Sequence, residues 1–228
     1  MSGSERRFES FGPDALRFLQ ALDFHQSREW FAENRELYET QLRAPLIALC
    51  EEMGERAKGR GLDLHFDAKK GPFRINRDVR FSNDKRPYNR HVSAVLSPDG
   101  TKKSFGVLYV HIGLERSFFA AGYWALPKDE LNLFRRHIVT HPERYRELLE
   151  ALASANLQMD TDAALKRLPR GWDDPDDEEV AGALRLRGFT VHREVPNDAI
   201  HEQTLLERLD RFASDIEPLL RWGAPILR

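Results

Sequence analysis

Three short runs rich in β-branched and aromatic residues lie close together in the middle of this chain of 228 residues. They cover residues 92–97, 104–112 and 117–124. Turn-forming residues separate them, Pro98-Asp99-Gly100 first and then Gly113-Leu114-Glu115-Arg116. Such runs are typical of β-strands, and connections this short join antiparallel neighbours. The sequence therefore predicts a three-strand antiparallel meander over about 91–124.

The segments on both sides of the meander carry apolar residues at helical spacing, and residues 189–195 have the composition of a further strand. Helices are expected over 14–22, over 27–58 with Pro45 bending the helix or starting a second one, over 127–152 with a break at His141-Pro142, and over 198–220. The predicted fold class is α+β. A central antiparallel sheet, made of the meander plus one or two further strands, is flanked by N-terminal and C-terminal helices.

Both alternating sets of side chains in the last two strands of the meander are largely apolar. Because apolar side chains on both faces of a sheet need cover, the flanking helices are expected to cover both faces at least in part. The sequence contains no internal repeat, low-complexity linker or abrupt change of composition. Residues 1–228 are therefore expected to form a single domain.

Charge is nearly balanced over the whole chain, with 35 Lys and Arg against 37 acidic residues and a formal net charge of −2. Any binding of anions therefore has to be local. The first residues lack the apolar stretch of a secretory signal, and the longest apolar run, 118–126, is too short to span a bilayer. We expect a cytoplasmic protein without a membrane partner. The single cysteine, Cys50, lies among apolar residues and is expected in the core.

Positive charge is concentrated between residues 74 and 90. This stretch holds six cations against two anions, a local sum of +4 in an acidic chain: Arg74, Arg77, Arg80, Lys85, Arg86 and Arg90 against Asp78 and Asp84. Five of the six are arginines. A guanidinium grips phosphate or carboxylate through two hydrogen bonds and keeps its charge when buried.

An extended backbone over 73–81 would sort these side chains onto two faces. One face would carry Arg74, Asn76, Asp78 and Arg80, and the other Phe73, Ile75, Arg77, Val79 and Phe81. Asp78 would then orient the neighbouring arginines. Because Ser82-Asn83-Asp84 favours a turn and Pro87 keeps Arg86 extended, Lys85 and Tyr88 are expected to fold back towards this row.

A solvated, salt-bridged strand edge is the alternative interpretation of the same charges. The interleaved apolar side chains argue against it, because residues such as Phe73, Ile75, Phe81 and Tyr88 favour burial. We therefore interpret the stretch as a functional site.

Residues 74–88 resemble the signature RxxRDxRFxxxKxPY of the DUF2461 family. Every fixed position is met, by Arg74, Arg77, Asp78, Arg80, Phe81, Lys85, Pro87 and Tyr88. Other blocks of the family are similar to three further segments of this chain: residues 16–38, Gly122-Tyr123-Trp124, and Leu165-Lys166-Arg167-x-Pro169-x-Gly171. The family is one of unknown function. The resemblance implies a single domain of this length and an important motif, and it implies no activity.

Weaker signals lie elsewhere in the chain. Two further groups of cations would contribute to the site if the fold brought them to the motif. They are Lys166 with Arg167, and Arg185 with Arg187. His137 and His141 are one helical turn apart but lack a third ligand, so no metal site is expected. The acidic stretch 173–179 lacks the spaced ligands of a calcium loop and is expected to cap a helix. The sequence leaves the question of a cofactor open.

Three functions are compatible with these features. The first is a binding module for a phosphorylated small molecule, a nucleotide or nucleic acid, with Tyr88 or Trp124 stacking on a base. Its predicted ligand-binding residues are Arg74, Arg77, Asp78, Arg80, Lys85, Tyr88, Arg90, Trp124, Lys166 and Arg167.

The second is a metal-assisted phosphoester hydrolase in which Asp78 and Asp84 hold a cation or act as base and Lys85 stabilises developing charge. The third is a structural or protein-interaction domain in which the motif is a buried ion-pair network. The sequence leaves open whether the protein is an enzyme.

Overall fold

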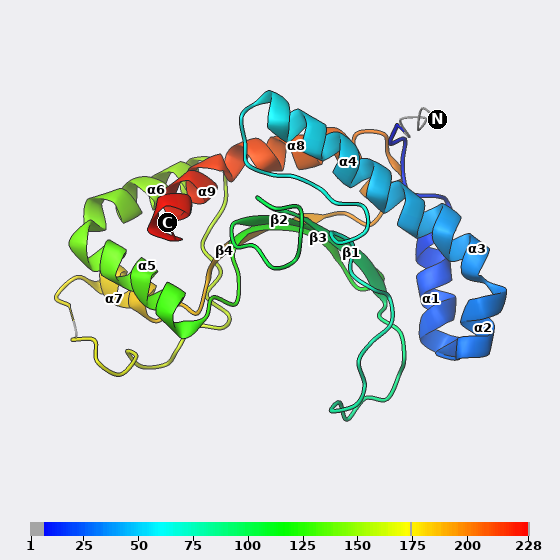
Figure 1. The fold of residues 1–228 in the computed structure, drawn as a ribbon, viewed down its shortest axis with the longest axis horizontal. Coiled ribbons are helices and arrows are strands. Elements are labelled where there is room, and N and C mark those ends of the chain that lie inside the picture. The colour runs from blue at the N-terminus through cyan, green and yellow to red at the C-terminus, as the bar shows by residue number, and fades with distance from the viewer. Residues whose placement is uncertain (1–6, 174, 228) are drawn as a thin grey trace.

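The computed structural model describes residues 7–173 and 175–227 (Figure 1). Its centre is an antiparallel sheet with the strand order β1-β2-β3-β4. The strands are β1 (His91–Leu96), β2 (Val107–Gly113), β3 (Ser117–Tyr123) and β4 (Phe189–Val195). The register pairs Ala94 with Val110, Val110 with Phe119, and Phe119 with Arg193. The predicted meander and the predicted strand at 189–195 are confirmed.

Gly122 lies near the end of β3, at a position where the backbone requires glycine. Its φ of 121° is disfavoured for other residues, and a Cβ at this position would collide with the carbonyl of Phe189 in the neighbouring strand. A close approach of β3 and β4 therefore depends on this residue.

The N-terminal helical region is more divided than its hydrophobic periodicity predicts. It consists of α1 (Ala15–His25), α2 (Arg28–Glu33), α3 (Arg35–Tyr38), the π-helical turn η1 (Glu39–Arg43) and α4 (Ala44–Gly59). Ser27 caps α2 by accepting a hydrogen bond from the backbone N–H of Trp30. Pro45, which has no N–H to donate, lies in the first turn of α4 directly after the π turn.

The C-terminal half contains α5 (Lys128–Thr140), α6 (Pro142–Ser154), α7 (Glu178–Leu184), η2 (Ala199–His201), α8 (Leu205–Asp215), α9 (Glu217–Gly223) and η3 (Ala224–Leu227). The predicted break at His141-Pro142 separates α5 from α6. The acidic stretch caps a helix as expected, because Asp177 accepts hydrogen bonds from the backbone N–H groups of Glu179 and Val180. Asp174 lies outside the described residues. None of the described helices is long and apolar enough to cross a membrane.

Helices cover one face of the sheet. Figure 1 shows α4 and α8 lying across this face, where Leu108, Val110 and Ile112 are fully buried. The side chains of Tyr109, His111 and Phe118 alternate with them and are half-buried on the opposite face. The expectation that helices cover both faces is therefore wrong. Irregular segments take part of that role, and Phe73 packs edge-on against Tyr109.

Candidate functional site

The arginine-rich motif forms an irregular hairpin that leaves the sheet at β1 (Figure 1). Its two arms pair through Arg77 N–H to Pro87 O at 2.8 Å and Asn89 N–H to Ile75 O at 2.8 Å. Ile75 and Tyr88 are buried at the base of the hairpin. The hairpin therefore has an apolar root, and its polar side chains are free to face the sheet or solvent.

Tyr88 fixes this root to the N-terminal helices. Its ring stacks on Phe31 with centroids 4.6 Å apart. The amide of Gln26, the C-cap of α1, accepts a hydrogen bond from Tyr88 N–H at 3.1 Å and donates one to Tyr88 O at 3.3 Å. Tyr88 was one of two residues, with Trp124, expected to stack on a base, but it is only 4% exposed and its ring lies in the core.

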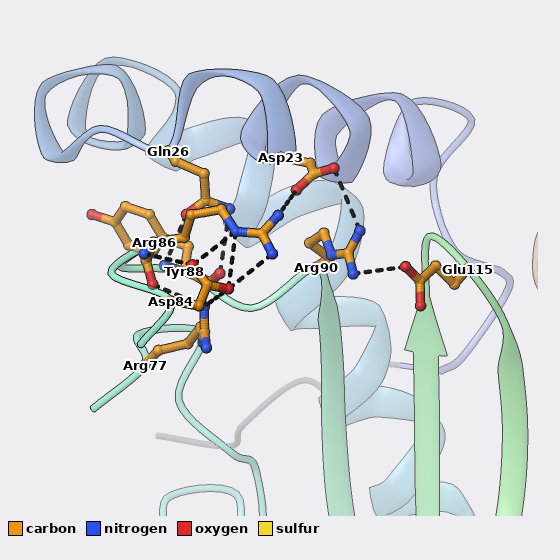
Figure 2. Close-up of polar contacts among 8 residues, drawn as sticks. All are labelled: Asp23, Gln26, Arg77, Asp84, Arg86, Tyr88, Arg90 and Glu115. Atoms are coloured by element: carbon orange, nitrogen blue, oxygen red, sulfur yellow. Dashed lines mark hydrogen bonds and ion pairs between the residues drawn. The ribbon is translucent and has the colours of Figure 1, made fainter. Parts of the chain in front are cut away.

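Most of the motif arginines form a network of ion pairs (Figure 2). Asp84 accepts from Arg77 at 2.7 Å and from Arg86 at 2.8 Å, and Arg86 also reaches Asp23 of α1 at 3.0 Å. The network ends with Arg90, which lies 3.6 Å from Asp23 and 2.6 Å from Glu115 in the β2–β3 turn. We call these contacts the hairpin network. They join the hairpin to α1 and to the sheet.

The two motif carboxylates are both held as ions. Hydrogen bonds from Arg86 and Arg77 lower the pKa of Asp84 well below its usual range. Hydrogen bonds from Arg80 lower the pKa of Asp78, and the two side chains meet at 2.6 Å. Asp78 therefore orients Arg80 alone. The extended arrangement predicted that it would orient the neighbouring arginines together.

The hairpin tip departs from the predicted extended row. The backbone turns at 79–82, where Ser82 N–H approaches Val79 O at 3.4 Å, and Lys85 folds back to donate to Val79 O at 3.0 Å. Phe81 is 95% exposed, with the Arg80 guanidinium over its ring at 5.8 Å. The expectation that Phe81 is buried is wrong, because the turn carries it beyond the reach of the core.

A cavity of about 790 Å³ separates the hairpin from the uncovered face of the sheet. We call it the wide cavity. The hairpin contributes one wall and the sheet and the β1–β2 connection the other: Phe73, Arg74, Asn76, Arg77, Asp78 and Asn89, against His91, Ser93, Lys102 and Tyr109.

Arg74 and Lys102 are the unpaired cations of the wide cavity. Neither forms an ion pair with a carboxylate in the described part of the chain; Lys102 donates to Pro72 O at 2.7 Å. Partial burial and the positive charge of Arg74 lower the pKa of Lys102. Two like charges thus repel each other at this cavity, and an anion between them would relieve the repulsion.

A second cavity, of about 300 Å³, adjoins the first. We call it the narrow cavity. Arg77, Asn89 and His91 line both, and His111 and Arg116 line the narrow one. The rings of His91 and His111 lie 4.2 Å apart, and Tyr109 Oη is 3.0 Å from His111 Nδ1. Burial, then the neighbouring His91 and Arg116, lower the pKa of His111 to about 3, so this imidazole is neutral at physiological pH.

Three predicted site residues lie away from the motif. Trp124 is exposed beyond the far end of β3, whereas the hairpin starts at the opposite end of the sheet, where β1 begins. Lys166 and Arg167 are exposed in the yellow connection between α6 and α7, away from the teal hairpin (Figure 1). Of the predicted residues, Arg74, Arg77, Asp78, Tyr88 and Arg90 contact the cavities, while Arg80 and Lys85 line neither.

Sequence reasoning missed Lys102, His91, His111, Tyr109 and Arg116 as site residues. The strand alternation did contain a signal, because His111 shares a face with Tyr109 and places an imidazole among apolar neighbours. Nothing local pointed to Lys102, which lies 28 residues beyond Arg74 and meets it only through the long β1–β2 connection.

Metal-binding geometry is limited to pairs. His137 and His141 have ring centroids 5.1 Å apart. Within residues 7–173 and 175–227 there is no group of three or more His, Cys, Asp or Glu that could hold a metal ion.

Comparison with known proteins identifies the family. A family model described as "Conserved hypothetical protein (DUF2461)" matches residues 14–222. This chain belongs to the DUF2461 family. No curated protein and no solved structure matches it. The match covers α1 to α8, the sheet and the hairpin, and all but the last residue of α9.

Proposed function

We propose that this DUF2461 protein is an anion-binding module that holds a phosphorylated ligand in the wide cavity. The observation that carries the proposal is the pair of cations, Arg74 and Lys102, which face a cavity of about 790 Å³ without a carboxylate partner in the described residues. The volume falls in the range of small-molecule sites.

The other walls of the wide cavity suit a phosphorylated organic ligand. Asn76 and Asn89 bring amide groups, Ser93 a hydroxyl, and Tyr109 and Phe73 apolar ring surface. Charged groups would hold the phosphate, and the amides and rings would select the remainder of the molecule. A nucleotide or a short stretch of nucleic acid has these features.

The hydrolase alternative has less support from the geometry. Arginines occupy the carboxylate oxygens of Asp78 and Asp84, and their lowered pKa values make both poor proton acceptors at neutral pH. Lys85 Nζ is directed to a backbone carbonyl of its own loop. We therefore assign the chemistry of this hairpin to binding.

The structural alternative is supported by a specific observation, the hairpin network. It accounts for Arg77, Arg86 and Arg90, whose guanidiniums meet carboxylates of three different segments. The two roles are compatible, because the network positions the hairpin wall of the wide cavity.

Titration calorimetry at low salt tests the binding function with inorganic phosphate, adenosine monophosphate and a short oligonucleotide as probes. The double substitution Arg74→Ala, Lys102→Ala should weaken binding about 10- to 100-fold, the effect of losing charge-assisted hydrogen bonds. The matched control Lys166→Ala, Arg167→Ala removes the same charge from the distant α6–α7 connection and should leave the affinity unchanged. Equal weakening by both variants, or no binding of any probe by the wild type, would contradict the proposal.

A further inference from the structure

The wide and narrow cavities have a common wall. Arg77, Asn89 and His91 line both of them, so a ligand lying in the wide cavity is already against the boundary of the narrow one. Arg77 keeps its position at this boundary through its contact with Asp84 at 2.7 Å. A ligand that extends past Arg77 would therefore meet the residues that line the narrow cavity.

The narrow cavity also carries positive charge. Its arginines are Arg77, Arg86, Arg90 and Arg116, and its acids are Asp84 and Glu115, a local excess of two positive charges. The first three arginines belong to the hairpin network, in which each has a carboxylate at 2.6 to 2.8 Å.

Arg116 is the exception among these four. In the described part of the chain its ion pair is with Glu194 at 3.5 Å, and both side chains are more than half exposed, 60% and 54%. Such pairs contribute little and are readily exchanged. The guanidinium lies over the ring of Phe118 at 4.5 Å, which holds it at the edge of the narrow cavity beside His111.

Two histidine side chains add hydrogen-bonding groups to the narrow cavity. His91 and His111 both line it, and burial lowers the pKa of each, so they are neutral around pH 7. Neutral imidazoles can donate a hydrogen bond to an anion without opposing the neighbouring arginines. The pocket thus pairs one available cation with two polar rings, in a volume of about 300 Å³ that suits a single small anionic group.

From these two cavities we infer that the ligand carries two phosphate groups, the first held by Arg74 and Lys102 and the second by Arg116, with Arg77 between them. This inference rests on the proposed function and adds the second phosphate subsite. Two sources share this chemistry, a small molecule phosphorylated twice and the consecutive phosphates of a single-stranded nucleic acid.

Matched probes that differ by one phosphate test the second subsite. Adenosine 5′-monophosphate is compared with adenosine 3′,5′-bisphosphate, and a dinucleotide is compared with its 5′-phosphorylated form, all by calorimetry at low salt. For the wild type, the added phosphate should tighten binding about tenfold or more in at least one of the two pairs, as one charge-assisted contact predicts. The pair that shows the gain identifies the source.

Substitution of Arg116 then tests whether this residue causes the gain in affinity from the added phosphate. Arg116→Ala should abolish the effect of the added phosphate and leave monophosphate affinity unchanged, and Arg116→Lys should retain part of it. Arg170→Ala, an exposed cation in the α6–α7 connection, is the charge-matched control and should behave as the wild type. The thermal melting of each variant checks that it is folded.

The outcomes separate the two proposals. Monophosphate binding that depends on Arg74 and Lys102, with no gain from a second phosphate or with a gain that survives Arg116→Ala, would overturn the second subsite and leave the binding function standing. Absence of binding for every probe would remove both.

Discussion

The cations around the hairpin divide into two regions with different surroundings. In the hairpin network, Arg77, Arg86 and Arg90 meet Asp84, Asp23 and Glu115 (Figure 2). At the wide cavity, Arg74 and Lys102 meet no carboxylate of the described residues and repel each other. Arginines that are concentrated in one short stretch of sequence therefore differ in their surroundings: most form ion pairs, whereas Arg74 faces a cavity and has no carboxylate partner among the described residues.

The two regions depend on each other in space. The hairpin stands away from the sheet, and the network, together with the Tyr88 root, ties it to α1 and to the β2–β3 turn. Because the hairpin forms one wall of the wide cavity, the ion pairs of the network hold the wall that carries Arg74. The following predictions alter the hairpin, the narrow cavity and the network in turn, starting with the largest effect.

Tyr88→Ala should destabilise the protein by about 3 to 5 kcal/mol, because it removes a buried ring from the root of the hairpin. Phe81→Ala, a matched aromatic of the same motif that is 95% exposed, should change the free energy of unfolding by less than about 0.5 kcal/mol. Urea denaturation of the two variants measures the difference. Similar losses would mean that the tip, like the root, is part of the packed structure.

The imidazole of His111, which lines the narrow cavity, should make the stability of the protein depend on pH. His111 binds a proton near pH 3 in the folded state and near 6.5 when unfolded, so acidification favours the unfolded chain. Between pH 6.5 and 4.5 this group should reduce stability by about 2 to 3 kcal/mol in total. His111→Phe should remove that part of the dependence, as measured by urea denaturation at several pH values.

The control for this pH experiment is His65→Phe, at an exposed position away from both cavities. It removes an exposed imidazole, so its effect on the pH dependence of stability should be smaller than that of His111→Phe. An unchanged slope in His111→Phe would show that the imidazole is not buried as the structure places it.

Asp23→Asn should leave Arg86 and Arg90 of the hairpin network with less negative charge around them. It removes a carboxylate shared by Arg86 and Arg90, at a cost of up to about 1 kcal/mol in stability. The released guanidiniums should make phosphate raise the melting temperature more than it does in the wild type.

Asp14→Asn is the matched control for Asp23→Asn. It breaks an exposed pair with Arg17 next to the same helix, so its response to phosphate should equal that of the wild type. A response equal in both variants would mean that the network does not limit the charge available to anions.

Local patterns predicted the elements of the fold well. Strand alternation and turn residues gave the meander, and proline positions gave the break before α6 and the start of α4. They failed at two places. Phe81 follows a strand-like alternation, yet the turn at 79–82 leaves it exposed, and the long amphipathic segment is divided by a π turn.

The sequence by itself determined the fold class, the strands of the sheet, the family to which the chain belongs, and the concentration of positive charge at 74–90. Those properties follow from the order of neighbouring residues. The tertiary structure decided which arginines are neutralised and which face a cavity, because Asp23, Lys102 and Glu115 reach the hairpin only after the chain has folded. Electrostatic pairing depends on distance in space, and spacing along the chain does not fix that distance.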